Sequence, residues 1–229
     1  MRRLIRDISS ILILSGLLLV LDAGVTLIWQ EPVTYAIALV LRNDVNKRYL
    51  SFRTDPLSVT DTHALAHIGS LDEKIDYLAR RERRQVTTGD AIGQIEIPKI
   101  GNTYNIVQGT DTRSLEEGPG HYPSTALPGM GQTVAVAGHR TTYLAPFRFL
   151  NQVNTGDRIY ITMPYGRFTY VVQYQRIVAP TQTSVIDNVG YDRLVLSACN
   201  PLYSAAQRII VFARLRAVQP LGPARAASS

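Results

Sequence analysis

The sequence predicts an all-β domain that is preceded by a transmembrane helix and a helical spacer. Three observations lead to this prediction. Residues 8–29 form one long apolar run, and residues 31–90 are rich in charge with apolar residues at helical spacing. From residue 91 onward, short apolar runs alternate with turn-forming residues, which is the pattern of many short strands. The 229 residues suffice for one ordinary domain with such extensions.

The apolar run from Ile8 to Trp29 contains a single charged residue, Asp22. As a helix it would extend about 33 Å, enough to cross the hydrocarbon core of a bilayer. Three arginines precede it, so the positive-inside rule predicts a cytoplasmic N-terminus and an extracellular remainder. A cleaved signal peptide is the alternative, but the run is long and no clear A-x-A site follows it. We therefore assign residues 1–30 to a cytoplasmic tip and a single-pass anchor in the cell membrane.

Residues 31–90 are predicted to be a helical spacer or stalk between the membrane and the β domain. Apolar residues recur at helical spacing over 71–78, and the basic run at 80–84 favours a helix end there. His63 and His67 stand four residues apart, on one face of a helix. Because no third ligand is near them, a surface role is favoured over a metal site.

Residues 91–216 are predicted to form a closed barrel or a sandwich of short strands. One strand should present Phe168, Tyr170, Val172 and Tyr174 on a single face. The expected strands are 91–98, 103–107, 133–137, 158–163, 168–178, 193–198 and 208–215, with room for one more in irregular sequence. The tail at 217–229 is rich in Ala, Pro and Ser and is predicted to be disordered.

Composition excludes several classes of function. The net charge is +6, but the arginines of the β domain are scattered and not clustered with aromatic residues, which argues against nucleic-acid binding. A single cysteine, Cys199, excludes an internal disulfide framework and a cysteine-based zinc cluster. No metal cluster or nucleotide-binding loop is recognisable, so we expect no cofactor.

Three chemically versatile residues fall at the ends of expected strands. His139 follows the strand 133–137, Cys199 ends the strand 193–198, and Arg208 opens the last strand. A thiol nucleophile needs a partner that helps to supply the thiolate and later protonates the leaving amine. It also needs a donor for the oxyanion that forms at the attacked carbonyl. His139 and Arg208 are candidates for these two roles, whereas each residue alone would more often be structural.

Three segments carry a resemblance to a known family. They are GPGHYP at 118–123, AGHRTTY at 137–143 and LSACNP at 196–201, and Arg208 follows Cys199 by nine residues. In these motifs and in their order along the chain, residues 90–216 resemble the sortases. The longer phrases RTTYLAPF and PLYSAAQRI look most like the class E sortases of actinobacteria.

The resemblance implies an eight-stranded β-barrel and a cysteine transpeptidase. Such an enzyme cleaves a surface protein near its C-terminus, between Thr and Gly of an LPxTG-like or LAxTG-like sorting signal. It then transfers the protein to an amine, commonly on a cell-wall precursor. By the same resemblance Cys199 is the nucleophile, His139 the general acid/base, and Arg208 the residue that holds substrate and oxyanion.

The resemblance also assigns weaker candidates. His121 matches a recurrent position and is expected to be structural or to support the catalytic residues, and Tyr143 is a candidate for substrate contact. Ala198 and Asn200 flank the nucleophile and are candidates for substrate binding, although many sortases have Thr before the Cys and many have His after it.

Other functions remain possible at this stage. A non-catalytic, membrane-tethered barrel that binds cell-wall or surface partners is one, a pilin-polymerising sortase is another, and a sortase of class D or class F is a third. Papain-type and NlpC/P60-type peptidases place Cys before His, which is the reverse of the order here. An L,D-transpeptidase would place His and Cys in one short motif, whereas His139 and Cys199 are 60 residues apart.

Overall fold

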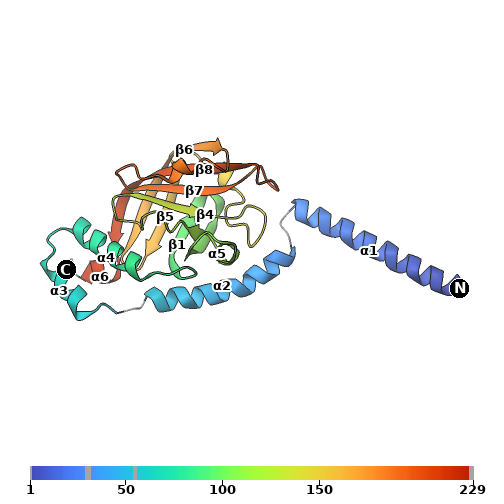
Figure 1. The fold of residues 1–229 in the computed structure, drawn as a ribbon, viewed down its shortest axis with the longest axis horizontal. Coiled ribbons are helices and arrows are strands. Elements are labelled where there is room, and N and C mark those ends of the chain that lie inside the picture. Colours follow the sequence, from blue (N-terminus) through green and yellow to red (C-terminus); the bar gives the residue numbers. More distant parts are fainter. Residues whose placement is uncertain (1, 29–31, 54–55, 227–229) are drawn as a thin grey trace.

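The computed structural model describes residues 2–28, 32–53 and 56–226 (Figure 1). Its helices are α1 (Arg2–Ile28), α2 (Pro32–Arg53), α3 (Val59–His67), α4 (Leu71–Gln85), α5 (Thr112–Glu117) and α6 (Gly222–Ala226). Its strands are β1 (Ala91–Ile97), β2 (Asn102–Gln108), β3 (Gly120–His121), β4 (Thr133–Ala137), β5 (Arg158–Met163), β6 (Gly166–Val178), β7 (Arg193–Asn200) and β8 (Gln207–Pro220).

The eight strands form one closed barrel in the order β1-β2-β3-β4-β7-β8-β6-β5, with β5 pairing back to β1. The pairs β2–β3 and β4–β7 are parallel, and the other pairs are antiparallel. The strand pattern was compatible with a closed barrel or a sandwich, and the closed sheet shows that the fold is a barrel. The seven expected strands are all present, and the eighth, β3, is only two residues long.

Every second residue of the strands fills the interior of the barrel. The alternation is clearest in β5 and β6, where Ile159, Ile161, Phe168 and Tyr170 are completely buried. Such burial is the main favourable term in folding a domain of this size. The strands therefore act as a rigid frame, and the residues beyond their ends are positioned by it.

The spacer segment is helical, as expected, but it packs on the barrel and does not extend from it as a stalk. Ile75, Leu78 and Ala79 of α4 belong to the same buried cluster as the barrel residues. Ser70 caps α4, because its side chain accepts from the backbone N–H of Glu73 at 3.2 Å. On α3 the rings of the two histidines lie 4.4 Å apart at the surface.

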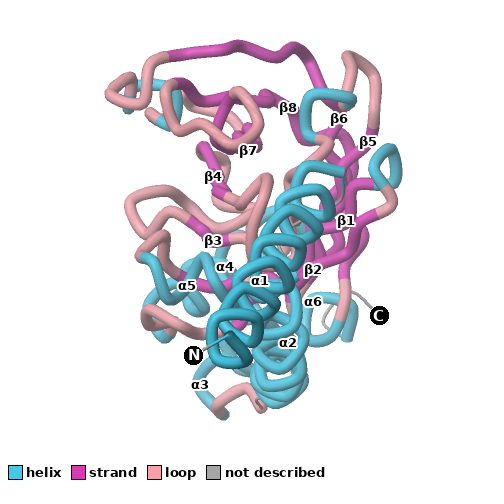
Figure 2. Tube along the Cα trace, turned by 90° about the vertical axis from the view of Figure 1, so that its right-hand side faces the viewer, coloured by secondary structure: helices cyan, strands magenta, loops and turns pink. Residues whose placement is uncertain are grey.

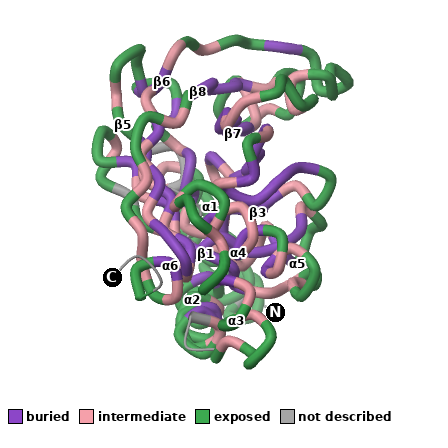
Figure 3. The backbone as a smooth tube through the Cα atoms, turned by 90° about the vertical axis from the view of Figure 1, so that its left-hand side faces the viewer, coloured by how far each residue is buried: buried purple, intermediate pink, exposed green. Residues whose placement is uncertain are grey.

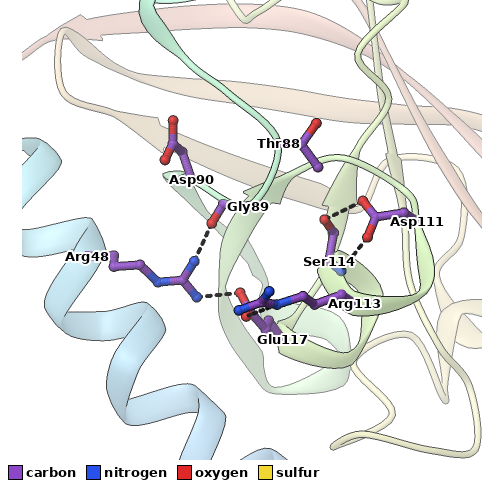
Figure 4. Close-up of a pocket in the computed structure, with 8 residues that line it drawn as sticks. All are labelled: Arg48, Thr88, Gly89, Asp90, Asp111, Arg113, Ser114 and Glu117. Carbon is purple, nitrogen blue, oxygen red and sulfur yellow. Dashed lines mark hydrogen bonds and ion pairs between the residues drawn. The ribbon is translucent and has the colours of Figure 1, made fainter.

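Helix α2 lies along one side of the barrel (Figure 1). Ala38, Val45 and Tyr49 are buried on its inner face, and α2 contacts β1, β2 and α5. Arg48 donates to the Gly89 carbonyl and to the Glu117 carboxylate of α5. Figure 4 shows these contacts beside a polar cavity of about 340 Å³. Helix α2 is thus fixed to the barrel by apolar and charged contacts.

Helix α1 projects away from the barrel and is exposed along most of its length (green in Figure 3). In the described part of the chain it is the one helix, over Arg3–Val25, that is long and apolar enough to cross a membrane. Figure 2, viewed from the side toward which α1 projects, shows α1 in front of the barrel and α2 lower in the view. Trp29, at the end of the apolar run, lies outside the described residues.

The prediction of a disordered tail at 217–229 is wrong for the residues that the structure describes. Strand β8 continues to Pro220, because the 13-residue strand β6 offers it a partner as far as Gly166. The short helix α6 follows, and Ala224 is completely buried. Residues 227–229 lie outside the described residues.

A register shift in β6 corrects one further expectation. The pairing with β8 shifts between Val172 and Tyr174, so the alternation of faces is interrupted there. Phe168, Tyr170 and Val172 point into the barrel as predicted, whereas Tyr174 is 44% exposed. Its ring stacks on Phe212 with the ring centroids 4.7 Å apart.

Candidate functional site

The parallel pairing of β4 with β7 brings the ends of these two strands together. Ala137 pairs with Ser197, and the backbone N–H of Gly138 donates to the Ser197 carbonyl at 3.0 Å. His139 and Cys199 each follow this pair by two residues. Because neighbouring strands lie about 4.8 Å apart, this register places the imidazole and the thiol on adjacent segments at one end of the barrel.

The antiparallel pairing of β7 with β8 adds the third residue. Cys199 lies directly opposite Arg208, and side chains that are directly opposite share a face of the sheet. Arg208 Nη1 donates to the carbonyls of Ala205 and Gln207, each at 2.9 Å, which ties the cation to the turn between the strands. The fold therefore brings together the three residues that sequence analysis grouped.

A small cavity of about 70 Å³ adjoins this face of the barrel. One wall includes Ser197, Arg208 and Ile210, and Ser197 points to the same side of β7 as Cys199 because the two residues are two apart. The other wall comes from the end of β6 and the connection to β7, at Val178, Ala179, Pro180, Gln182, Thr183, Val185 and Ile186. The lining mixes aliphatic and polar side chains with the cation of Arg208, and Cys199 follows the lining residue Ser197 by two positions.

The loop that carries His139 is fixed by its own packing. A Cβ atom on Gly138 would lie 2.6 Å from the Phe147 ring, so only glycine fits before the histidine. The Phe147 N–H donates to the His139 carbonyl at 2.9 Å. Residues 143–145 have positive φ angles of 49°, 64° and 41°, and the Ala145 N–H closes this turn on the Thr142 carbonyl at 2.8 Å.

Tyr143 and Glu116 define the surroundings of the His139 ring. The Tyr143 ring lies with its centroid 5.6 Å from that of His139, and its hydroxyl donates to Glu116 Oε1 at 2.9 Å. Burial lowers the pKa of His139, and the negative charge of Glu116 opposes this lowering. Tyr143 is thus beside the imidazole, and Glu116 is the carboxylate that favours its protonated form.

Arg140 is a residue to which sequence analysis assigned no role, although it lies within the quoted motif. It is 4% exposed. Its Nε donates to the Arg148 carbonyl at 3.2 Å, and its Nη2 donates to Asn151 Oδ1 at 2.8 Å. Its Nη1 donates to the Cys199 carbonyl at 3.3 Å and to Asn200 Oδ1 at 3.1 Å. Arg140 therefore ties the His139 loop to the end of β7.

None of the four hydrogen-bond acceptors of Arg140 carries a negative charge, which is unusual for a buried guanidinium. Burial lowers the pKa of the Arg140 guanidinium, the nearby Arg148 lowers it further, and a Cys199 thiolate opposes this lowering. Arginine is rarely buried without a partner, and here the guanidinium is held by four neutral acceptors, one of them the Cys199 carbonyl.

His121 lies in a closed polar cluster and not with the other three residues. It is 1% exposed, its Nδ1 lies 2.8 Å from Gln108 Oε1, and its Nε2 lies 2.9 Å from the Ala126 carbonyl. Burial lowers the pKa of His121 to about 4, so the ring is neutral at pH 7 and has a single N–H. The atoms nearest to the two ring nitrogens, Gln108 Oε1 and the Ala126 carbonyl oxygen, are both acceptors, so the single N–H of the neutral ring donates to one of them only. These contacts fit a structural role.

The two residues that flank Cys199 differ in orientation. Ala198 is buried in the barrel core, so a substrate contact at this position would have to be made by the backbone. The Asn200 side chain accepts from Arg140, and its Nδ2 donates to Gln207 Oε1 at 3.2 Å. Asn200 thus holds the ends of β7 and β8 together, and the sequence alone gave no sign of this.

Comparison with known proteins agrees with this arrangement. Residues 95–216 match the family model described as the sortase domain. The chain belongs to the sortase family. It is 35% identical over 131 residues to sortase D of Bacillus subtilis (strain 168), which is 56% of this chain and 65% of that protein. It is 27% identical over 175 residues to sortase SrtE1 of Streptomyces coelicolor, which is 69% of this chain and 50% of that protein.

Solved sortase structures resemble the barrel as well. Sortase E of Streptomyces avermitilis is 34% identical, with a TM-score of 0.54 over 59% of this chain and 93% of that one. Sortase E1 of Streptomyces coelicolor, solved with a tripeptide in its active site, is 25% identical, with a TM-score of 0.55 over 59% of this chain and 94% of that one. The sortase fold expected from the motifs, with its eight-stranded barrel and N-terminal apolar helix, is confirmed.

Proposed function

We propose that this sortase is a cysteine transpeptidase with Cys199 as nucleophile, His139 as general acid/base and Arg208 as the residue that binds substrate and oxyanion. The observation that carries the proposal is the register of β4, β7 and β8, which sets these three side chains around one strand end. The family supports the reaction type and a peptide substrate.

The proposed reaction follows from the chemistry of the three residues. The Cys199 thiolate attacks the carbonyl carbon of the scissile peptide bond, and the resulting oxyanion accepts hydrogen bonds from the Arg208 guanidinium. When the C–N bond breaks, protonated His139 gives its proton to the leaving amine, and a thioester remains on Cys199. An incoming amine then loses a proton to His139 as it attacks the thioester, the C–S bond breaks, and the Cys199 thiolate and protonated His139 are restored.

We propose a sorting signal of the LPxTG or LAxTG kind, cut between Thr and Gly, as the donor, and a cell-wall precursor amine as the acceptor. The class E motifs and the 34% identity to a sortase E support this choice. Tyr143 is the proposed substrate contact, because its ring lies beside His139 at the edge of the site. Its hydrogen bond to Glu116 would fix the ring as one wall for the side chain that precedes the threonine.

The proposed location is the cell membrane, with α1 as the single span, the N-terminus in the cytoplasm and the barrel outside. The length and apolar surface of α1 support the span, and the arginines before it support the orientation. In this arrangement residues 1–30 are the anchor, residues 31–90 are the helical segment that packs on the barrel, and the catalytic barrel begins at residue 91.

The test is transpeptidation by the full chain in detergent, with LPxTG and LAxTG peptides and a soluble amine as acceptor. We expect a product in which the new amide follows the threonine, and a thioester at Cys199 in the absence of amine. The Cys199→Ala variant should give neither. If neither peptide is cleaved, or if Cys199→Ala forms the same product, the proposed function is wrong.

Alkylation of the thiol gives an independent check. Cys199 is partly exposed in the folded protein, so an electrophile should modify it without denaturant. The sorting-signal peptide should protect the thiol, because a peptide bound for attack by Cys199 covers the sulfur. A thiol that reacts only after unfolding would favour the non-catalytic barrel.

A further inference from the structure

The first part of α2 carries an exposed apolar surface that the barrel does not cover. Val33, Ile37, Leu39 and Val40 are between 42% and 67% exposed, although the opposite side of the helix is packed on the barrel. No charged residue occurs from residue 32 to residue 41. We call these four side chains the α2 apolar surface. Val33, Ile37 and Val40, at spacings of four and three residues, share one side of the helix, and Leu39 lies about 100° around the axis from Val40. Exposed aliphatic side chains that gather in this way are typical of a contact surface.

The polarity of this outer side changes abruptly after residue 41. Asp44 and Lys47 follow on this side, and they form an exposed ion pair at 3.9 Å. Lys47 stands seven residues after Val40, so the two side chains point in nearly the same direction about 10 Å apart along the axis. One side of one helix is therefore apolar at its start and charged two turns later.

The position of α2 in the chain, directly after α1, points to the membrane as the partner of this surface. Helix α1 ends at Ile28 and α2 begins at Pro32, so four peptide units, which span at most about 15 Å, join them. If α1 crosses the bilayer, the start of α2 lies at the membrane surface. The change from apolar to charged side chains then follows the distance from the bilayer. Figure 1 shows the two helices meeting at one end of the barrel.

We propose that the α2 apolar surface lies in the interface of the lipid bilayer and holds the barrel against the membrane; the inference rests on the proposed membrane anchor. Helices of this kind bury their apolar side at the boundary between headgroups and acyl chains. The inner side of α2 is fixed to the barrel by Arg48 and its partners, so the orientation of α2 is transmitted to the whole domain.

The arrangement places the candidate site near the membrane. Arg42, which directly follows the apolar part of α2, lines one small cavity together with Tyr143 and Leu144. The same Tyr143 lies beside His139. In Figure 1, β4 points toward the end of the barrel at which α1 and α2 meet. The site would thus face substrates that are themselves held at the membrane surface.

The test uses the full chain in vesicles of phosphatidylethanolamine and phosphatidylglycerol. Cys199→Ala removes the only cysteine, and Val40→Cys or Lys47→Cys then gives one labelling site on the outer side of α2. An environment-sensitive fluorophore at position 40 should emit at a shorter wavelength than the same fluorophore at position 47. Lipids with a spin label near the headgroup should quench it severalfold more than they quench the fluorophore at position 47. The fluorophore at position 47 is the matched control. A second label, at Ile37→Cys, should behave as position 40 does.

Flotation of the vesicles separates this inference from the proposed anchor. Protein that floats, with positions 37 and 40 quenched no more than position 47, would overturn the inference and leave the anchor intact. Protein that does not float would overturn both. Thermal unfolding of each labelled variant shows that α2 is still packed, since the labelled side chains are exposed and make no contact with the barrel core.

Discussion

Two regions of the barrel contain a histidine close to the end of a short strand, and they differ in almost every physical respect. His121 is closed in by Gln108, Thr125 and Ala126, and the partners at both ring nitrogens belong to the folded frame. His139 is half-buried at the end of β4, beside an aromatic ring and near a carboxylate. Both residues follow a glycine in the sequence.

The comparison teaches that the surroundings of a histidine decide its chemistry. Burial is the main cause that lowers the pKa of both imidazoles. The negative charge of Glu116 opposes it at His139, whereas at His121 the hydrogen bond with the Ala126 carbonyl opposes it and the positive charge of Arg83 adds to it. The His121 ring has fixed partners at both nitrogens, so it could pass a proton to a substrate only if these contacts were broken. The His139 ring lies at the end of β4 and can exchange a proton with a bound substrate. The first histidine is therefore expected to stabilise the fold and the second to catalyse.

Substituting each histidine by alanine is the strongest test of the different roles assigned to His139 and His121. His139→Ala should lower kcat by about 10²- to 10⁴-fold, which is the usual contribution of a general acid/base, and should change the melting temperature little. His121→Ala should leave kcat within a few-fold and lower the free energy of unfolding by about 1–3 kcal/mol, because it orphans buried polar groups. Steady-state kinetics and thermal unfolding of both variants measure this. An exchange of the two effects would reverse our assignment.

Acid stability gives the second test, and it addresses His121 alone. The unfolded ring has a pKa near 6.5 and the folded ring a pKa of about 4, so between these values only the unfolded state binds the proton. The protein should therefore lose stability as the pH falls through this window, by up to about 3 kcal/mol in total. Urea unfolding from pH 7 to pH 4 measures the loss. The His121→Gln variant is the control and should show a shallower dependence on pH.

Two buried arginines extend the comparison from the histidines to the frame that carries the site. Arg140 joins the His139 loop to the Cys199 carbonyl, whereas Arg193 donates to the Val185 and Asp187 carbonyls at the other end of β7. We expect Arg140→Lys to lower kcat by about 10- to 100-fold with little change in KM, because lysine lacks the planar fork of donors. Arg193→Lys should lower stability and leave kcat near that of the parent.

Kinetics and thermal unfolding of the two lysine variants distinguish positioning from simple stabilisation. If both variants lose stability to the same degree and only Arg140→Lys loses kcat, Arg140 positions the catalytic residues. If Arg140→Lys keeps the parental kcat, its hydrogen bond to the Cys199 carbonyl has no part in the reaction.

Most strands of the barrel and helix α1 were predictable from the sequence, because their positions depend on local patterns of apolar residues. The alternation of apolar residues located β4 and β5 to the residue, and the apolar run located α1. Strand β3 was missed because two residues carry no periodicity. The end of β8 was misplaced because its length is set by its partner β6, which is a property of the fold and not of the tail sequence.

The candidate site was predictable in part for the same reason. The motifs identified His139, Cys199 and Arg208, and strand register brings them together. The roles of Arg140 and Asn200 were not visible, because their hydrogen bonds join segments that are about 60 residues apart in the chain. Burial of Ala198 inside the barrel likewise follows from closure, which no local pattern specifies.

The smallest expected effect comes from Glu116, because its substitution changes the pKa of His139 and keeps the imidazole in place. Glu116→Gln deletes the charge that raises the pKa of His139 and keeps an acceptor for the Tyr143 hydroxyl. The pKa of His139 should fall further, so less imidazolium is present at neutral pH to protonate the leaving amine. The alkaline limb of the kcat/KM profile should move to lower pH, and activity at pH 7.5 should fall a few-fold. Glu117→Gln is the matched control, because the Glu117 carboxylate contacts Arg48 and Arg113. An equal shift in both variants would show that the profile responds to the overall charge of α5, and not to one carboxylate acting on the catalytic histidine.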